Sequence, residues 1–447
     1  MTNHPFDELS EQVGDKGASV PIATKNGTLP SAVAHAVDNA FNRRIQLRRF
    51  IKFLTSGSRG WGDYYADQGD VFIRIGNLPR ESLQLGGEVQ RVDLPSHVRE
   101  GQRTRLCEKD LLFSITAYIG SVAVVESGWI DAYVSQHVAL CRLDLAQMDP
   151  RFVGYFMLGT EGQDQLLQGA VGGTKVQLAL DDIRGLRIPV PPLVEQQRVA
   201  AYLDRELAKI DTLIAAQERF VGFLDERRDA VIRDAVPVPG QSKWKADKLG
   251  RRSIISNGAT PRREEEKYWR NGDFPWLNSS VVNLRAVIST DQFVTREAML
   301  ECHLPIAEPD DILVALTGQG KTRGMATILK IKATINQHLA CIHVDRTRWD
   351  PEYLLWSMKS VYRDLRRSSD ANGATKGGLT VDALKRHVLV MPPLAEQRRI
   401  ADYLNRETAK IDNLLAKTQR HIELARDRRI ALITAAVSGQ IDIPKEV

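Results

Sequence analysis

The residues that most resemble a catalytic motif are LTGQGKTRG, at positions 316–324. They follow the apolar run DILVAL and contain Gly-Lys-Thr, as do the loops that bind nucleotide phosphates. Such a loop follows the pattern GxxxxGK[ST], and the place of its first glycine is taken by Ala315. The matching stretch in the first half of the chain, TAYIGS, lacks the lysine. The sequence therefore does not predict nucleotide binding, and Lys321 and Arg323 are better explained as cations that contact the phosphates of a nucleic acid.

No other set of residues predicts catalysis or a metal centre. The histidines show neither HExxH nor any paired spacing, and the four cysteines form no CxxC. The (N/D/S)PP(Y/F/W) motif of adenine methyltransferases is absent, because the Pro-Pro pairs stand in PVPPL and VMPPL. A glycine-rich cofactor loop followed by an acidic residue is missing as well. We therefore expect a chain that is not an enzyme and that holds no cofactor of its own.

Two glycine-containing loops, one in each half, carry side chains that could bind a nucleic acid. They are SGSRGWG (56–62) and NGATPRR (257–263). Backbone amides and short polar or basic side chains in such loops can bond phosphates or base edges. The side chains concerned are Ser58, Arg59, Thr260, Arg262 and Arg263. An ordinary turn explains both loops equally well.

A second pair of loops, GGTK and GATK, also matches between the halves. Their small residues admit a close backbone approach, while Thr and Lys supply a hydroxyl and a charge for phosphate. The residues are Thr174, Lys175, Thr375 and Lys376. The alternative is a turn that is capped by threonine and leads into the next element. Gln136–His137 and Gln337–His338, which sit in β-prone runs, are better explained as satisfied core or sheet residues.

Basic residues gather near the start of each half. The cluster NRRIQLRRF contains Arg43, Arg44, Arg48 and Arg49, and the comparable region of the second half contains Arg251, Arg252, Arg262 and Arg263. Basic runs are often only the solvated face of a domain. Their recurrence in both halves strengthens the case for contact with phosphates, but a solvated face stays the slightly better explanation.

These residues are positioned by a sequence that is built twice. PPLVEQQRVAAYLDRELAKID (191–211) returns as PPLAEQRRIADYLNRETAKID (392–412), with 15 of 21 positions identical. The same offset of 201 residues relates Asp110 to Asp311 and Gln136–His137 to Gln337–His338. The chain is therefore a tandem duplication of a unit of about 200 residues, which is too long for a solenoid repeat.

Each repeat begins with a part that predicts a strand-rich domain. Residues 45–190 and 245–391 hold short β-prone runs such as VFIRI and DILVAL between Gly, Pro, Asn and Asp. Within them, RFVGYFMLGTEGQDQLL and EYLLWSMKSVYRDLRR each predict one internal helix. A Pro-Pro pair ends this part, so that a helix can start only after Pro192 or Pro393.

Each repeat continues with a part that predicts one long helix. From Val194 to about Val236 there is no proline, and Gly222 is the single glycine. Apolar residues at three- and four-residue spacing form a seam in both copies: Val199, Leu203, Ile210, Leu213, Ile214, Phe220, Val221, Leu224, Val231 and Ile232, then Ile400, Leu404, Ile411, Leu414, Leu415, Ile422, Leu432 and Ile433. At ~1.5 Å per residue such a helix is a rod of about 60 Å. The two helices are expected to pair, and antiparallel pairing would hold the two domains apart; the alternative is that each helix packs only on its own domain.

A strand-rich domain that ends in (I/V)P(V/M)PPLxEQxR(V/I), then a long helix, then the whole unit again, resembles the specificity subunit of type I restriction–modification systems. The resemblance covers about residues 45–447 and implies an α+β fold with two target recognition domains joined and separated by two long coiled-coil helices. We expect a partly disordered N-terminal extension (1–44), which exceeds the usual start of the family. The remaining parts are the recognition domains (45–190 and 245–391), the first spacer helix (191–237), and the second spacer helix with the C-terminal tail (392–447).

The same resemblance implies a function. Each domain reads one half of a split site in double-stranded DNA, and the chain, without catalysis of its own, docks two methyltransferase subunits and optionally two motor–nuclease subunits. S-adenosylmethionine, ATP and Mg²⁺ are then expected on those partners, and the modified base is an adenine. Glu195, Gln196, Glu396 and Gln397 belong to the region implied to contact the methyltransferase subunits, although helix capping explains them more simply. The two domains differ most at 58–109 and 259–310, so we expect two different half-sites.

The composition agrees with a globular protein that binds a polyanion. The chain is 26% charged and 43% hydrophobic, and 61 Lys and Arg against 56 Asp and Glu give a pI near 8.9. The start, MTNHPFDELSEQVGDKG, is polar, and no run approaches the ~18 apolar residues of a membrane span, so we expect a cytoplasmic protein. A coiled-coil scaffold that binds only proteins remains the alternative function.

Overall fold

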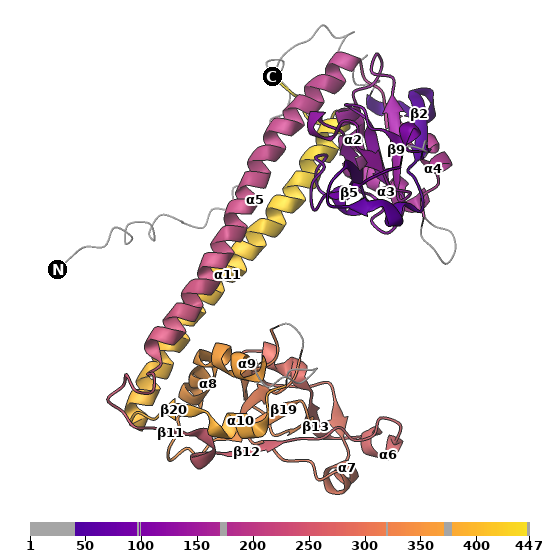
Figure 1. Cartoon of the computed structure of the whole chain (residues 1–447). Coiled ribbons are helices and arrows are strands. Elements are labelled where there is room, and N and C mark those ends of the chain that lie inside the picture. The colour runs from indigo at the N-terminus through magenta and orange to yellow at the C-terminus, as the bar shows by residue number, and fades with distance from the viewer. Residues whose placement is uncertain are drawn as a thin grey trace, which may run out of the picture. The chain divides into compact units, whose positions relative to one another are not determined.

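The computed structural model describes residues 41–95, 98, 100–169, 177–318, 321–370 and 378–444 (Figure 1). Residues 1–40 of the expected N-terminal extension lie outside this part. The contacts divide the chain into a first unit, made of Met1–Ala215 and Glu423–Val447, and a second unit, Ala216–Ile422. Both boundaries fall inside the long helices, so each of these helices begins in one unit and ends in the other. No described helix is long and apolar enough to cross a membrane.

The first unit contains the strand-rich first domain. Its main sheet is antiparallel and has the order β2-β9-β6-β7. Its second sheet has the order β3-β5-β4-β8. Strand β1 pairs with β10, the strand that leads into helix α5. The elements are β1 (Arg44–Gln46), β2 (Ile51–Ser56), β3 (Tyr65–Ala66), β4 (Asp70–Ile73), β5 (Gln90–Val92), β6 (Leu111–Ser114), β7 (Val122–Val124), β8 (Tyr133–Val134), β9 (Val138–Leu143), α2 (Pro150–Leu158), α3 (Thr160–Gly169), α4 (Leu180–Gly185), β10 (Arg187–Pro189) and α5 (Leu193–Ala235). Ile73 and Val134 of one sheet and Leu112 and Leu140 of the other are fully buried in one cluster, so the two sheets pack on each other.

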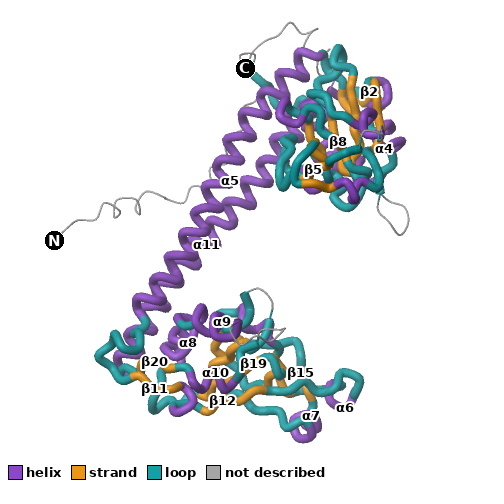
Figure 2. Tube along the Cα trace, in the orientation of Figure 1, coloured by secondary structure: helices purple, strands orange, loops and turns teal. Residues whose placement is uncertain are grey.

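The second unit repeats this plan in the second domain. Its sheets have the orders β12-β19-β16-β17-β14 and β15-β13-β18, and β11 pairs with β20, which leads into helix α11. The elements are β11 (Ala246–Lys248), β12 (Ile254–Asn257), α6 (Glu266–Trp269), β13 (Phe274–Leu277), β14 (Ala286–Val287), β15 (Phe293–Val294), α7 (Arg296–Glu301), β16 (Ile312–Ala315), β17 (Ala326–Leu329), β18 (Thr334–Ile335), β19 (Leu339–His343), α8 (Pro351–Ser360), α9 (Tyr362–Asp370), α10 (Val381–Arg386), β20 (Val388–Val390) and α11 (Leu394–Val437). Leu277, Ile335, Leu313 and Leu339 form the matching core. Figure 2 shows that the strands of each unit gather in its domain and that the long helices carry none.

The internal helix of each domain is broken into two, and the prediction of one helix is wrong in both copies. Both start as expected, because Asp149 and Asp350 accept backbone N–H groups of the first turn and a proline occupies the first helical position. Gly159 then leaves the helix with φ −74° and ψ 167°, and Val361 ends the second copy with φ −93° and ψ 7°. At the first break, the hydroxyl of Thr434 in α11 accepts from the Thr160 N–H at 3.2 Å, so a tertiary contact replaces the lost helical bond.

The two long helices start where the Pro-Pro pairs predict. Helix α5 has 43 residues from Leu193 and α11 has 44 residues from Leu394, about 65 Å each at ~1.5 Å per residue. Most predicted seam residues are buried, but Leu213, Phe220 and Leu414 are 50, 42 and 45% exposed and do not belong to the seam. The reason is the 3.6-residue turn, since Leu213 precedes the buried Ile214 and therefore points about 100° away from it.

The long helices are antiparallel in each unit. In the first unit, Arg429 of α11 contacts Asp211 of α5 at 3.0 Å. In the second unit, Arg228 of α5 contacts Asp412 of α11 at 3.5 Å. Ile232, one turn later in α5, shares a core cluster with Leu404, which comes two turns before Asp412 in α11. The two chains therefore run in opposite directions. That cluster includes residues of the second domain, so the helices pack both on each other and on the domain of their unit. The alternative in which each helix packs only on its domain is therefore wrong.

Candidate nucleic-acid interface

The loop that follows the first strand of each main sheet lies against the turn between two later strands. The Ser58 N–H donates to the Val134 carbonyl at 3.1 Å, and the Gln136 N–H donates to the Ser58 carbonyl at 3.0 Å. A Cβ atom at Gly57 would lie 2.0 Å from the Val134 oxygen, and one at Gly258 would lie 1.6 Å from the Ile335 oxygen. Both loops therefore need glycine at this place, which explains why LTSGS and ISNGA share it.

A cluster of three polar side chains, the Thr–His–Gln cluster, joins this turn to the loop after the next strand. In the first domain the Gln136 amide nitrogen lies 3.0 Å from Nε2 of His137, and Nδ1 of His137 lies 3.0 Å from the Thr116 hydroxyl. The imidazole thus bridges the Gln136 side chain and the Thr116 hydroxyl through its two ring nitrogens. The prediction of satisfied residues is confirmed, but both residues occupy the turn between β8 and β9 and not a strand.

The second domain repeats the Thr–His–Gln cluster and extends it. Thr317 lies 2.8 Å from Nδ1 of His338, and Gln337 lies 3.2 Å from Nε2. In addition, the Thr260 hydroxyl donates to the Gln337 side-chain oxygen at 2.6 Å. The predicted loop residue Thr260 is thereby tied to the turn, and the two regions form one surface.

The described residues that follow GGTK and GATK lie at the same edge of each domain. Thr174, Lys175, Thr375 and Lys376 lie outside the described residues. After these loops the Leu178 N–H donates to the Ile115 carbonyl at 3.0 Å, and the Leu379 N–H donates to the Leu316 carbonyl at 2.8 Å. Leu178 and Leu379 therefore lie beside the residues that precede Thr116 and Thr317.

The Gly-Lys-Thr stretch lies at this edge without the surroundings of a nucleotide site. A phosphate-binding loop of that class leads into a helix, whereas this one leads into strand β17. Lys321 is exposed, and its carbonyl accepts from the Tyr362 hydroxyl at 2.7 Å. Arg323 is only 8% exposed, so it presents much less of its side chain than Lys321 does, and phosphate contact by either residue stays a prediction.

The SGSRGWG and NGATPRR loops, which we call the recognition loops for the role predicted above, differ in their aromatic surroundings. In the first domain, Ser58 is nearly buried, Arg59 is exposed, and Trp61 packs in the core against Phe72 and Tyr133 at ring distances of 5.4 and 5.2 Å. In the second domain, Arg262 is exposed, and the guanidinium of Arg263 lies 4.1 and 5.1 Å from the ring centres of Trp269 and Trp276. We did not expect these tryptophans to take part, although KYWRNGDFPW places both shortly after the loop.

Of the arginines near the domain entrances, Arg262 and Arg263 lie in the NGATPRR loop at this edge, whereas Arg44 and Arg252 bind acidic side chains elsewhere in their domains. Arg44 forms two bonds of 2.7 Å to Glu161, and Arg252 forms one of 2.7 Å to Asp247, so both stabilise the domain. Arg43 and Arg48 are exposed. Strand β2 has six residues, about 20 Å at 3.3 Å per residue, and it separates Arg48 from Ser58. A phosphate contact by Arg43 or Arg48 would therefore be separate from the loops.

Gln196 and Gln397 have a different role from the one predicted. Both side chains are fully buried. The Gln196 amide accepts the Asp149 N–H at 2.9 Å and donates to the carbonyl of Pro191 at 2.8 Å, and Gln397 forms the same bonds to Asp350 and Pro392. These amides fasten the start of each long helix to its domain, which corrects the expectation that they contact a partner subunit.

Glu195 and Glu396 remain at the surface of the helix start. They form ion pairs with Arg198 and Arg399 one turn later. The Arg399 guanidinium lowers the pKa of Glu396. Contact of these two carboxylates with a partner subunit stays a prediction.

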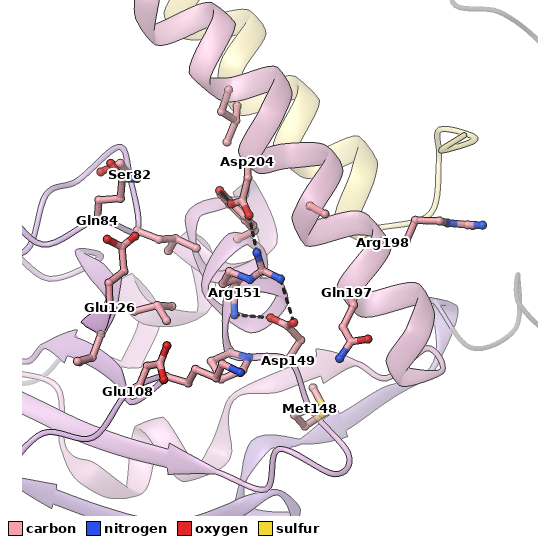
Figure 3. A pocket seen from close by; sticks show the side chains of 18 of the residues that line it. Ser82, Gln84, Glu108, Glu126, Met148, Asp149, Arg151, Gln197, Arg198 and Asp204 are labelled. Atoms are coloured by element: carbon pink, nitrogen blue, oxygen red, sulfur yellow. Dashed lines mark hydrogen bonds and ion pairs between the residues drawn. The ribbon is translucent and has the colours of Figure 1, made fainter. Parts of the chain in front are cut away.

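A cleft of 1370 Å³ lies between the first domain and α5 (Figure 3). Arg151 bonds both Asp149 and Asp204, and the Tyr155 hydroxyl donates to Asp204. Burial, and then the Asp204 carboxylate, raise the pKa of Tyr155. At the matching place of the second unit, the Trp356 indole donates to Asn405 at 3.0 Å. The polar side chains of the cleft thus connect the internal helix to the long helix. The same connection occurs in the second unit with different side chains.

Among the described residues, Asp311, Cys341 and His343 form the one group with the donor types and spacing of a metal site, with ligand atoms within 4.8 Å. Nδ1 of His343 lies 2.9 Å from Asp311, and Nε2 lies 3.0 Å from Ser256. Burial strongly raises the pKa of the Cys341 thiol, whereas a metal needs the thiolate. The first domain has the ion pair Asp110–Arg142 at this place, so the group is explained as an internal contact between an acidic and a basic side chain that stabilises the domain.

Comparison with known proteins agrees with this architecture. The family model of the type I restriction modification DNA specificity domain matches residues 96–218 and 241–424. The specificity subunit of the type I restriction enzyme EcoR124I/EcoR124II of Escherichia coli is 22% identical over 186 residues, 41% of this chain and 45% of that protein. The EcoKI specificity subunit of E. coli K12 is 24% identical over 278 residues, 57% and 58% of the two chains. The chain thus spans about half the length of these relatives.

Two solved structures share the fold. One, from work on complex assembly and conformational transition of the type I R-M system, has a TM-score of 0.72 at 18% identity and covers 89% of this chain and 98% of that chain. The HsdS subunit of Thermoanaerobacter tengcongensis has a TM-score of 0.52 at 17% identity, with 89% and 97% covered. Since the family model matches more than half of its residues, in both repeats, the chain belongs to the type I restriction–modification DNA specificity family.

Proposed function

We propose that this chain reads a two-part, asymmetric site in double-stranded DNA and, without catalysis of its own, directs adenine methyltransferase and endonuclease subunits to it. One observation carries the proposal: the same loop edge occurs in both domains, with the Thr–His–Gln cluster repeated and the neighbouring loop side chains changed. Groups shared by both domains suit features shared by any DNA, such as phosphates. Loop side chains that differ between the two domains are suited to reading bases that differ between the two half-sites.

Two linked domains gain specificity from each other. Binding of the first half-site makes the second binding event intramolecular, and the gain is lost when the spacing does not fit. The long helices, which run from one unit into the other, would provide such a linkage. The site is therefore split, and the two halves differ because the two recognition loops differ.

Exposed apolar residues on the long helices support the docking of two partner subunits. Leu213 on α5 matches Leu414 on α11, and Phe223 matches Leu424, with the offset of 201 residues in both pairs. All four side chains are at least 45% exposed, although a helix that only paired with its repeat would carry polar residues there. The first unit holds Leu213 and Leu424, and the second holds Phe223 and Leu414. Two similar surfaces fit two copies of one partner, here a methyltransferase subunit, with two motor–nuclease subunits joining the complex.

The reaction then belongs to the partners. S-adenosylmethionine would bind the methyltransferase subunits, ATP and Mg²⁺ the motor–nuclease subunits, and this chain would work with them on DNA in the cytoplasm.

The test is a map of methylated adenines across the genome of the native host, with and without this gene. The proposal expects one split, non-palindromic motif to lose methylation when the gene is deleted. A map that does not change, in a host that expresses the methyltransferase, contradicts it. Binding of the purified complex to DNA over a range of salt separates a DNA reader from a protein scaffold, because phosphate contacts make affinity fall steeply with salt.

A further inference from the structure

The recognition loop of the second domain holds one arginine in a fixed orientation. The guanidinium carbon of Arg263 lies 4.1 Å from the ring centre of Trp269 and 5.1 Å from that of Trp276. Its Nη2 atom donates to the side-chain oxygen of Gln292 at 3.2 Å. Despite these contacts Arg263 is exposed. The side chain is thus held by ring faces and one hydrogen bond while part of it still reaches solvent.

The loop backbone beneath Arg263 is fixed by the same two tryptophans. The Trp269 indole N–H donates to the Arg262 carbonyl at 2.9 Å, and the Trp276 indole N–H donates to the Ala259 carbonyl at 3.2 Å. Thr260 is tied to Gln337, as described above. An arginine on a loose loop would lose much side-chain and backbone freedom on binding a ligand. Here most of that freedom is lost when the domain folds.

The first domain has no such arginine at the matching place. Counted from Gly57 and Gly258, Arg263 falls at the place of Gly62. The second loop is three residues longer up to the next strand, since Phe72 pairs with Tyr133 and Trp276 pairs with the matching Thr334. In the shorter first loop, Trp61 is buried against Phe72 and Tyr133. The Thr–His–Gln cluster, by contrast, is present in both domains. A group found in only one domain can distinguish the base sequence of one half-site from that of the other.

A stacked, planar guanidinium suits one base in particular. Its parallel N–H groups match the O6 and N7 acceptors that guanine presents in the major groove. A phosphate can accept the same paired donors. Phosphates are alike in every DNA sequence, however, so they do not call for a group that only one of the two domains carries. Resting on the proposed function, we infer that Arg263 reads a guanine in the half-site of the second domain.

The experiment uses the complete complex of this chain with its methyltransferase subunits. Wild type, Arg263→Ala and Arg263→Lys are compared with Arg262→Ala, which removes the neighbouring exposed arginine. Methylation rates are measured on a DNA library in which every base pair of both half-sites is varied in turn. Melting temperatures of the four chains show whether each variant is folded.

Arg263→Ala is expected to lower the rate on the cognate site by roughly 10- to 100-fold. One guanine of a single half-site should become replaceable by other bases, while the other half-site keeps its preferences. Arg263→Lys should behave in the same way, because lysine keeps the charge but loses the plane and the paired donors. Arg262→Ala should keep the wild-type base preference.

Three results would overturn the inference. One is an equal loss on all sequences with a salt slope lower by about one, which marks a phosphate contact. The second is an unchanged base preference in folded Arg263→Ala, and the third is a wild-type preference in Arg263→Lys. A wild-type complex that prefers no sequence at all would instead contradict the proposed function, so the two failures are distinguishable.

Discussion

Replacement of Lys359 by leucine is expected to stabilise the second unit at neutral pH. Lys359 lies in α8, with its ammonium 4.7 Å from the ring centre of Trp356. Burial lowers the pKa of Lys359 to about 8, with a further contribution from the positive charges of Arg228 and Arg285, against which Glu352 and Asp412 act. At the matching position the first domain has Leu158, which is buried, so the fold accepts leucine there.

The expected gain follows from the pKa of Lys359. The fall from 10.5 to about 8 corresponds to a cost of about 3 kcal/mol for keeping the charged form in the folded state, at ~1.36 kcal/mol for each pKa unit. Leucine removes this cost but also the contact with Trp356, worth about 0.5–2 kcal/mol. The free energy of unfolding should rise by about 1–3 kcal/mol, and the melting temperature of a unit of this size by roughly 3–10 °C.

The pH dependence gives a second, independent readout. Because the pKa of Lys359 is lower in the folded state, the unfolded chain binds more protons between pH 8 and 10.5. Wild-type stability should therefore gain a rising contribution across that window, and the Lys359→Leu chain should lack it. Below pH 8 the lysine is charged in both states, and the difference between the two proteins is constant.

Urea unfolding followed by tryptophan fluorescence from pH 7 to 10.5 measures both effects. Lys410→Leu is the matched control, since this exposed lysine of α11 pairs only with nearby Glu407 on the helix surface and its loss should change stability by less than ~1 kcal/mol. A Lys359→Leu chain that is less stable than wild type at pH 7, or that shows the same rise with pH, would refute the reasoning.

Further predictions concern the helix starts, the partner surfaces and the shared cluster. Gln397→Ala should lower the free energy of unfolding by about 1–3 kcal/mol, because it leaves buried backbone groups unpaired; an unchanged melting temperature would contradict this. Phe223→Asp with Leu414→Asp should leave the melting temperature of the isolated chain nearly unchanged and weaken retention of a methyltransferase subunit in pull-downs; full retention would exclude this surface. His338→Ala should weaken binding of cognate and non-cognate DNA to a similar degree, whereas a changed base preference would show that the cluster reads sequence.

The elements that could be predicted are those with a local physical signal. The Pro-Pro pairs set the starts of α5 and α11, because proline and the residue before it exclude helix. The 201-residue offset predicted two equivalent domains, and the β-prone runs between turn residues predicted their strands. The break at Gly159 was missed, and the Thr160 N–H that it frees is bound by Thr434, which lies far away in the sequence.

The candidate site was predictable only in part, because its side chains are defined by contacts across the fold. A polar residue in the first turn of a helix usually faces water, yet Gln196 is covered by a segment 47 residues earlier in the chain. Arg263 was named from its loop, but the rings that hold it come from a short helix and from strand β13. Arg323 has the same composition signal as Lys321 and differs from it only in burial.

Comparison of the two domains distinguishes two kinds of sequence difference: those that preserve an internal contact and those that change the exposed surface. Asp110–Arg142 becomes Asp311–His343, but an acid still pairs with a basic side chain at the same place. Such differences are compatible with an unchanged fold and say nothing about the DNA sequence.

The presence of Arg263 in only one of the two loops is of the other kind. The second domain has an exposed cation on a fixed loop where the loop of the first domain has Gly62 beside the buried Trp61, so the two domains present different groups to their surroundings. Specificity for one half-site has to reside in differences of this second kind, because only they alter what a bound DNA would meet. The same criterion predicts that exchange of residues 259–263 alone into the first domain fails to transfer a base preference, since Trp269 and Trp276, which orient the arginine, would be missing. Transfer of the base preference by this short exchange would show that the stack is not needed.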